Sequence, residues 1–303
     1  MSERILFVTT AKQCCDNAAK VAFELAFKNE AQLYLFNVIG LPYRGFSYAV
    51  TDLKSGETVT ADLDYIAWVE DELKGIYEKQ LASIAEEKVL TQLAVGVPAT
   101  EILRFARQKE IDLIVMGAVD TEGFDSVSAH EKEIIGNTVQ RVARSARCPV
   151  LIVNKHCTNW LQGLSNIVFC TDFSKRADAA FQLACATAQK YDAKLYLFHS
   201  LDTSTGSTSD LEEARQLMQK KYISRMSAYD NYQIEIRVGT PYEEILKYAS
   251  DNQADLIVMA HHGKKKSDIE DCVWTTVEHV AKRSACPVGT VRNSDYQSGL
   301  SVG

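Results

Sequence analysis

Short runs of apolar residues recur along this chain, and between them apolar positions fall three or four residues apart. The short runs are rich in Val, Ile, Leu and Phe, which is typical of strands buried on both faces of a sheet. The runs predict ten strands: Ile5–Thr10, Leu33–Val38, Thr91–Val95, Leu113–Gly117, Val150–Val153, Ile167–Thr171, Leu195–Ser200, Ile234–Val238, Leu256–Ala260 and Val288–Val291.

Helical periodicity follows the first predicted strand and returns after the sixth. Two apolar stripes with the spacing i, i+3, i+4, i+7 lie 162 positions apart (180 − 18): Ala18, Val21, Ala22 and Leu25, then Ala180, Leu183, Ala184 and Thr187. Pro98 and Pro241 stand where a helix would begin, a position that tolerates the missing N–H. Strands alternating with helices predict an α/β fold with right-handed crossovers and helices on both faces of a mostly parallel, doubly wound sheet.

The apolar runs are copies of one another. The matched pairs are "ILFVTT" from Ile5 with "IVFCTD" from Ile167, "GVPATEIL" from Gly96 with "GTPYEEIL" from Gly239, "DLIVM" at Asp112 and Asp255, and "RCPV" from Arg147 with "ACPV" from Ala285. The offset falls from 162 to 143 and then to 138, so the first copy carries extra residues in two loops. We therefore expect a duplicated five-stranded domain over residues 1–156 and 163–293, with two separate sheets and not one continuous sheet.

Three connecting segments complete this organisation. The larger insertion, about residues 40–61, has apolar positions on both sides of a Lys54–Glu57 turn and predicts a small hairpin. The corresponding segment of the second copy, Asp202–Asp210, is small and polar and predicts a loop. A short polar join over about 154–163 links the domains, and a polar tail covers 294–303.

Charge and length exclude several classes of protein. The net charge is 33 − 40 = −7, which argues against non-specific binding to nucleic acid or to an anionic membrane. No apolar run approaches the roughly 20 residues of a membrane span. The first residues, "MSERILFVTT", carry charges where a signal peptide would be apolar, so we expect a cytoplasmic protein.

Eight cysteines are scattered without a CxxC pair or a metal-ligand spacing, and we expect them to be reduced. The adjacent pair Cys14–Cys15 leaves two interpretations open, a redox sensor or partly buried residues at a helix start. His261 and His262 do not predict a metal site, because neighbouring residues at a strand end point apart and no third ligand is in sight.

An open parallel sheet binds ligands beyond the carboxyl ends of its strands, where helix N-termini and backbone N–H groups suit phosphate. The candidate loops follow the first and fourth strands of each copy: "TTAKQCC", "GAVDTEGFDSVSAHEKEIIGNT", "TDFSKRA" and "AHHGKKKSDIEDCVWTT". The sequence contains no GxxxxGK[ST] loop, no defensible Ser-His-Asp order and no evident pair of catalytic carboxylates, so we do not expect an enzyme.

The ordered set of motifs resembles the universal stress proteins in their tandem two-domain form. Its carriers are "CTDFSKRADAAFQLA", "VGTPYEEIL", "ADLIVMAHHG" and "SACPV" in the second copy, and "VGVPATEIL", "IDLIVMGA" and "IIGNTVQRVARSARCPVLIV" in the first. The resemblance implies a Rossmann-like domain, similar to adenine nucleotide alpha hydrolases, and domains paired through their last strands. In the nucleotide-binding branch it implies ATP or AMP, with Mg²⁺ beside a triphosphate, held by a G-x2-G-x9-G-[ST] loop with an Asp after the first strand.

The first copy keeps part of this pattern. Its candidate nucleotide-binding residues are Thr10, Val38, Gly117, Gly136, Asn137 and Thr138. Thr10 replaces the expected Asp, and Asp120 stands at the second glycine, where its charge would repel a polyphosphate unless a cation intervenes. The alternative for the Gly136 segment is a simple helix N-cap, which needs the same residue types.

The second copy keeps a different part. Asp172 and Gly263 fit the pattern, and Thr275 is the candidate hydroxyl, but Ala260 replaces the first glycine and Trp274 the third. Asp172 could equally cap the following helix, and the Lys264–Lys266 run is better explained as a solvated loop.

These features favour a non-catalytic stress-response regulator that binds ATP or AMP in at most one domain, with the first domain preferred because its glycines survive together. The alternatives are a ligand-free scaffold that acts through protein contacts and a slow ATPase. The exposed last strands, Val150–Val153 and Val288–Val291, are pairing templates, so we expect the two domains to cover each other's edges. A further homodimer is also possible on these grounds.

Overall fold

The computed structural model describes residues 3–40, 49–51, 58–60, 63–118, 136–158, 160, 163–202, 207–226, 229–261 and 276–292. The strands of the main sheet are β1 (Arg4–Val8), β2 (Gln32–Gly40), β5 (Val89–Gly96), β6 (Leu113–Gly117), β7 (Val150–Val153), β8 (Asn166–Cys170), β9 (Lys194–Leu201), β10 (Tyr232–Val238), β11 (Leu256–Ala260) and β12 (Val288–Val291). The helices are α1 (Asp16–Lys28), α2 (Leu63–Ile76), α3 (Glu78–Leu81), α4 (Pro98–Gln108), α5 (Asn137–Ser145), α6 (Ala177–Tyr191), α7 (Thr208–Lys221), α8 (Pro241–Asp251) and α9 (Thr276–Arg283).

All ten predicted strands are present, and their ends differ from the prediction by at most two residues. For example, β1 ends at Val8 and not at Thr10, because Thr9 and Thr10 already belong to the turn that leads into α1. Pro98 and Pro241 begin α4 and α8, as their missing N–H predicts. The predicted α/β class is confirmed.

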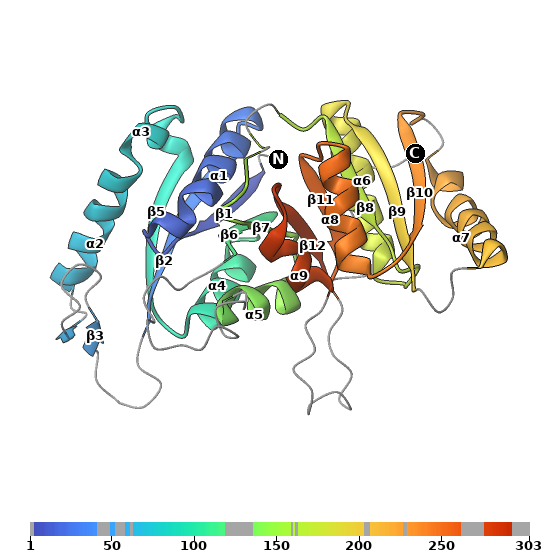
Figure 1. Ribbon diagram of the computed structural model, residues 1–303. Helices are drawn as coiled ribbons and strands as arrows, with labels where there is room; N and C mark the ends of the chain where they lie inside the picture. Colours follow the sequence, from blue (N-terminus) through green and yellow to red (C-terminus); the bar gives the residue numbers. More distant parts are fainter. Residues whose placement is uncertain are drawn as a thin grey trace.

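The strands form one continuous sheet in the order β10-β9-β8-β11-β12-β7-β6-β1-β2-β5 (Figure 1). Within each half all neighbours are parallel, but β12 pairs antiparallel with β7, with Val288 opposite Ile152 and Thr290 opposite Val150. The expectation of two separate sheets is therefore wrong. An edge strand with a free row of N–H and C=O groups is a template for pairing, and here the two last strands satisfy each other.

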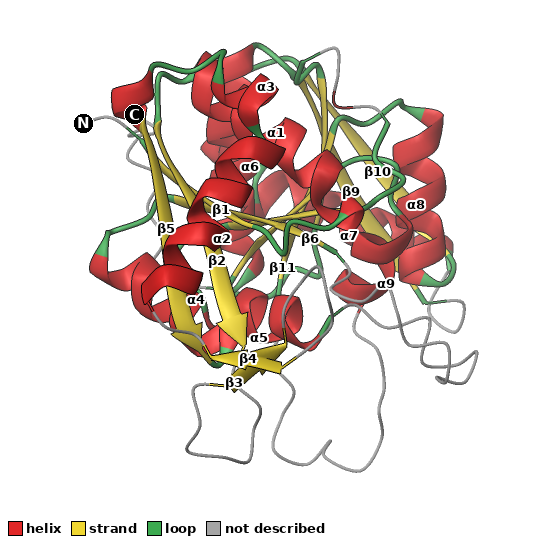
Figure 2. Cartoon of the chain, turned by 90° about the vertical axis from the view of Figure 1, so that its left-hand side faces the viewer, coloured by secondary structure: helices red, strands yellow, loops and turns green. Residues whose placement is uncertain are grey.

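Helices cover both faces of this sheet (Figures 1 and 2). Side chains of α1, α2, α6 and α7 share one buried core with the strands, and those of α4, α5, α8 and α9 share the other. Each core draws from both halves: Phe7 and Phe169 lie in the first, Leu6 and Val168 in the second. The halves are thus fused through a common sheet and common cores.

The backbone repeats with the offsets of the sequence. Six non-glycine residues of the described part have positive φ, and they form three pairs: Ala11 with Phe173 (both 59°), Glu30 (48°) with Asp192 (52°), and Glu110 (50°) with Gln253 (48°). The first two pairs are 162 positions apart and the third is 143 apart. Because positive φ is unfavourable for residues with a Cβ, its recurrence at matched sites supports the duplication.

Of the three connecting segments, one agrees with its prediction and two differ. The hairpin of the insertion is present as β3 (Ala49–Thr51) paired antiparallel with β4 (Thr58–Thr60). The predicted loop over Asp202–Asp210 is wrong at its end, because Ser207 caps α7, which begins at Thr208. The polar join is partly buried, since Asn154 and Trp160 are only 3% and 6% exposed.

The start of α7 explains why its polar sequence does not remain a loop. The Ser207 side chain accepts the Asp210 N–H, and the Asp210 carboxylate accepts the Ser207 N–H at 3.0 Å. Such a capping box satisfies two N–H groups that a helix start otherwise leaves unpaired.

Candidate functional site

The second half has a cavity of about 380 Å³ beyond the carboxyl ends of β8, β9 and β11. Its floor and sides are apolar, with Phe198, Ile245 and Met259 among the lining residues. Its polar lining comes from Thr171, Asp172, His199, Ser200 and Thr276, the first residue of α9. Small-molecule sites in proteins are typically cavities with a mostly apolar lining and a few polar groups, and their volumes are about 300–1,000 Å³.

The turn after β8 fixes the position of Asp172. Its Oδ1 accepts the Ser174 N–H at 3.0 Å, and the Thr171 hydroxyl accepts the Phe173 N–H at 2.9 Å. Phe173 has a φ of 59°, so the chain turns sharply here. Asp172 is thus held at the cavity edge by a hydrogen bond within its own turn. It does not cap the following helix, because the N-cap of α6 is Arg176 and no side chain makes a capping hydrogen bond there.

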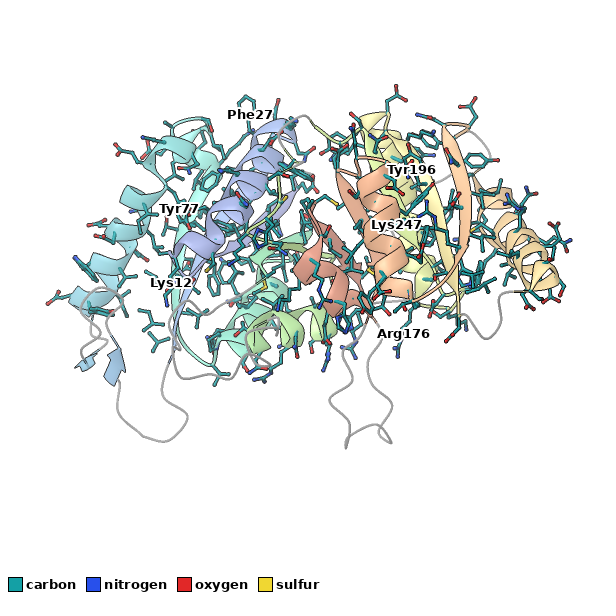
Figure 3. The ribbon with its side chains drawn as sticks, viewed as in Figure 1. Lys12, Phe27, Tyr77, Arg176, Tyr196 and Lys247 are labelled. Atoms are coloured by element: carbon teal, nitrogen blue, oxygen red, sulfur yellow. The ribbon has the colours of Figure 1, made fainter. Side chains whose placement is uncertain are left out.

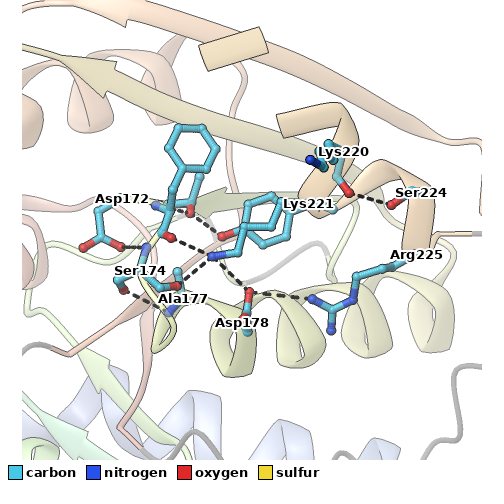
Figure 4. Close-up of polar contacts among 11 residues, drawn as sticks. Asp172, Ser174, Ala177, Asp178, Lys220, Lys221, Ser224 and Arg225 are labelled. Atoms are coloured by element: carbon cyan, nitrogen blue, oxygen red, sulfur yellow. Dashed lines mark hydrogen bonds and ion pairs between the residues drawn. The ribbon is translucent and has the colours of Figure 1, made fainter. Parts of the chain in front are cut away.

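Lys221, at the end of α7, holds the same turn from outside (Figure 4). Its ammonium group donates to the carbonyl oxygens of Phe173 at 2.6 Å and Ser174 at 3.1 Å, and it lies 3.4 Å from the Asp178 carboxylate. Two carbonyl bonds and an ion pair from one side chain restrict the turn that presents Asp172.

His199 extends from β9 into the same cavity. Its Nδ1 lies 2.7 Å from the Thr171 carbonyl oxygen, and because a carbonyl only accepts, Nδ1 carries the proton. Burial lowers the pKa of His199 against the opposing effects of that hydrogen bond and of Asp172. The ring is therefore neutral near pH 7, with Nε2 as an acceptor.

The first half has a smaller cavity, of about 140 Å³, at the equivalent place. The structure brings four of the predicted residues together in its lining: Thr10, Val38, Gly117 and Thr138. Gly136 is the N-cap of α5 and Asn137 its first residue, as the alternative interpretation of that segment predicts. Gly263 and Thr275 lie outside the described residues, as do Asp120 and Trp274.

Gly117 has a structural role that the motif did not indicate. A Cβ at this position would lie 3.1 Å from the Cys14 carbonyl oxygen, which is tighter than ordinary packing. The segment η1 (Gln13–Cys15) therefore approaches the end of β6 more closely than a larger residue would permit. Cys15 also lines this cavity, and the nucleotide pattern gave no signal for it.

Two segments of the chain, residues 1–154 and 163–292, match the model of the Universal stress protein family. The chain belongs to the universal stress protein family. Universal stress protein MJ0531 of Methanocaldococcus jannaschii is 30% identical over 162 residues, which are 50% of this chain and 82% of that protein. The predicted tandem arrangement is confirmed by the two matches.

A solved structure that aligns with nearly the whole chain shares the fold. The crystal structure of a universal stress protein from Archaeoglobus fulgidus DSM 4304 has a TM-score of 0.67 at 19% identity and covers 97% of this chain and 98% of that one. A structure of the universal stress protein from Archaeoglobus fulgidus in complex with dAMP aligns with 43% of this chain and 98% of that one, at 19% identity and a TM-score of 0.34.

Within the described residues, no group of three or more His, Cys, Asp or Glu side chains is placed to hold a metal ion. Among the described residues that line the larger cavity, Asp172 is the one carboxylate. Among the helices described, none has the length and apolar character that a membrane crossing requires.

Proposed function

We propose that this universal stress protein is a non-catalytic regulator that acts in the cytoplasm and binds an adenine nucleotide, ATP or AMP, in its second half. The observation that carries the proposal is the cavity of about 380 Å³ that Asp172 and His199 line. The sequence favoured the first half because its glycines survive there. The described part of that crevice, about 140 Å³, is below the range of small-molecule sites, which favours the second half instead.

The lining of the larger cavity suits the parts of a nucleotide. Phe198, Ile245 and Met259 offer an apolar surface for a flat base. The Asp172 carboxylate and the neutral His199 ring offer acceptors to the hydroxyl and amino donors of a nucleoside. The N-terminus of α9 at Thr276 offers N–H groups and a favourable dipole to phosphate.

Mg²⁺ would accompany only a triphosphate. This ion is commonly held by one or two carboxylates together with substrate phosphates. Asp172 is the residue of the described lining that fits this role. The proposal therefore assigns AMP binding to the protein alone and makes the metal a partner of ATP.

The test is titration calorimetry of the full chain with AMP, and with ATP plus Mg²⁺. We expect one site per chain. Asp172→Ala should weaken binding roughly tenfold or more, the effect of losing a hydrogen bond to a charged group worth about 1.5–3 kcal/mol. Thr10→Ala, the equivalent position of the first half, is the matched control and should leave affinity unchanged.

The opposite pattern, loss of binding in Thr10→Ala only, would return the site to the first half. No heat with either nucleotide at millimolar concentration would favour the ligand-free scaffold. That alternative has one specific support, since Ala260 stands in the larger cavity where the family's nucleotide loop begins with glycine.

A further inference from the structure

Two adjacent thiols lie at the first-half crevice, away from the proposed nucleotide site. Cys14 and Cys15 end η1, directly before α1, and are 5% and 4% exposed. Cys15 lines the cavity of about 140 Å³ together with Thr9, Thr10 and Thr138. Its Sγ lies 3.4 Å from the Thr10 hydroxyl oxygen. The sulfur is therefore shielded from most of the bulk solvent and faces a small, partly open crevice.

The fold does not require thiols at this place. The 162-residue offset puts Arg176 and Ala177 of the second half at the positions of Cys14 and Cys15. Both halves nevertheless continue into a long helix, α1 or α6. Gly117 belongs to the same arrangement, since a Cβ there would lie 3.7 Å from the Cys15 Sγ, and the second half has Ala260 instead. The thiol pair and its space are special to the first half.

The surroundings of Cys15 favour its thiolate. A hydrogen bond from the Cys14 side chain, with others from the backbone and hydroxyl of Thr10 and from Thr9, outweighs burial and lowers the pKa of Cys15 to about 6. Tyr77 stays neutral beside Cys15, because burial raises its pKa and the charges of Cys15, Asp16 and Cys14 raise it further. By contrast, burial raises the pKa of Cys148 and of Cys286 to about 12.

We propose that the first-half crevice is a modification site at which hydrogen peroxide oxidises Cys15 to a sulfenic acid. The thiolate sulfur attacks one peroxide oxygen, the S–O bond forms as the O–O bond breaks, and the departing hydroxide takes a proton to become water. Sulfur loses two electrons and the peroxide gains them. The cavity of about 140 Å³ has room for a few molecules of the size of water or hydrogen peroxide.

The geometry also decides the product. Neighbouring Cα atoms across a trans peptide are about 3.8 Å apart, whereas disulfides usually join Cα atoms about 4.4–6.8 Å apart. A Cys14–Cys15 disulfide is therefore strained, and the sulfenic acid persists until an external thiol reduces it. In this scheme Cys14 is a positioning residue that stabilises the thiolate and does not form a disulfide with it.

The experiment treats the full-length reduced protein with one equivalent of hydrogen peroxide and traps sulfenic acid with dimedone. Fragment-ion mass spectrometry then separates Cys14 from Cys15. We expect a single adduct on Cys15. Cys15→Ala, which installs the residue of the second half, should keep the circular dichroism spectrum and lose the adduct. Cys14→Ala should keep the adduct but slow its formation at least threefold at pH 7.

A second readout is the pH dependence of alkylation at Cys15 by iodoacetamide. Its midpoint should lie near 6 in the parent protein and move toward the ordinary value of about 8.5 in Cys14→Ala. The proposal is overturned if the parent gives no adduct, if Cys15→Ala is labelled as strongly as the parent, or if the main product is a Cys14–Cys15 disulfide.

Discussion

A buried pair of hydroxyl groups recurs at the same place in both halves. The Thr9 hydroxyl is 2.6 Å from the Tyr77 hydroxyl, and that of Thr171 is 2.7 Å from that of Tyr222. Tyr77, which Figure 3 labels, also packs against Phe7 of β1 and Phe23 of α1. Each threonine in addition accepts the N–H of the residue with positive φ two positions later.

Tyr222→Phe should therefore destabilise the protein by about 1–3 kcal/mol, because it leaves the buried Thr171 hydroxyl without its partner. Urea unfolding measures the change. Tyr77→Phe, which removes the matching hydroxyl partner of Thr9 in the first half, is the comparison and should cost a similar amount. Unchanged stability in both variants would contradict this explanation.

The pH dependence of stability should report on His199. Burial lowers its pKa from the ordinary value of 6.5 in the folded state. Below pH 6.5 the unfolded chain therefore binds more protons than the folded one, and stability falls as the pH falls. The contribution of His199 to the free energy of unfolding is complete above the pKa of the unfolded state. It is lost as the pH falls through the lower pKa of the folded state.

The matched variant is His199→Asn, because Asn37 makes the same bond in the first half, from its amide to the Thr9 carbonyl oxygen at 2.8 Å. Urea midpoints at pH 7.5 and pH 5 should differ less in this variant than in the parent protein. An identical pH dependence in the two proteins would mean that His199 is not the titrating group.

At the residue scale the sequence predicted where the site residues lie better than it predicted what each of them does. Motif spacing was enough to bring Thr10, Val38, Gly117 and Thr138 to one crevice, because the carboxyl ends of parallel strands meet at one edge. Spacing could not show that Gly117 makes room for the Cys14 carbonyl. Nor could it show that His199 faces a cavity, since that depends on packing between residues distant in the sequence.

At the scale of elements, the helices α5 and α9 connect the halves through one ion pair. The Arg144 guanidinium lies 2.6 Å from the Glu278 carboxylate, whose side chain is only 6% exposed. Arg144→Ala should cost about 1–3 kcal/mol, because it removes an ion-pair partner of a largely buried carboxylate.

Thermal or urea unfolding measures this cost, and Glu278→Gln in the Arg144→Ala background is the control. Neutralising the carboxylate should restore part of the stability. If the second substitution adds a full further loss instead, the other contacts of Glu278 dominate and the ion pair is not the cause.

Element types were predictable, but some boundaries were not. Alternation of apolar and helical periods located every strand of the main sheet. Most of these strands are buried on both faces and nearly continuous in apolar residues, whereas the edge strands β5 and β10 are only partly buried and contain polar residues. The segment before α7 was misassigned because Ser207 and Asp210 have the composition of a loop, and only their reciprocal hydrogen bonds make them a helix start.

At the scale of the molecule, the repeat predicted two like domains but not their fusion into one sheet. The edge-strand argument pointed to pairing of the last strands, and such pairing necessarily makes the two sheets continuous. The buried cores reinforce the union, since Val153 and Trp160 of the junction lie in the same core as residues of both halves.

Separating the halves should expose this dependence. Expressed alone, residues 1–162 and 163–303 would each present an unpaired last strand, β7 or β12, together with apolar side chains such as Leu151 and Val288 that are 5% and 0% exposed in the intact chain. Exposure of paired strand groups and apolar surface is unfavourable, so we expect the two halves to associate when mixed, or each to self-associate through the same edge. Sedimentation velocity of each half and of their equimolar mixture distinguishes these cases. Two stable monomers that do not associate would show that each domain is complete alone and that the β7–β12 junction is dispensable for folding.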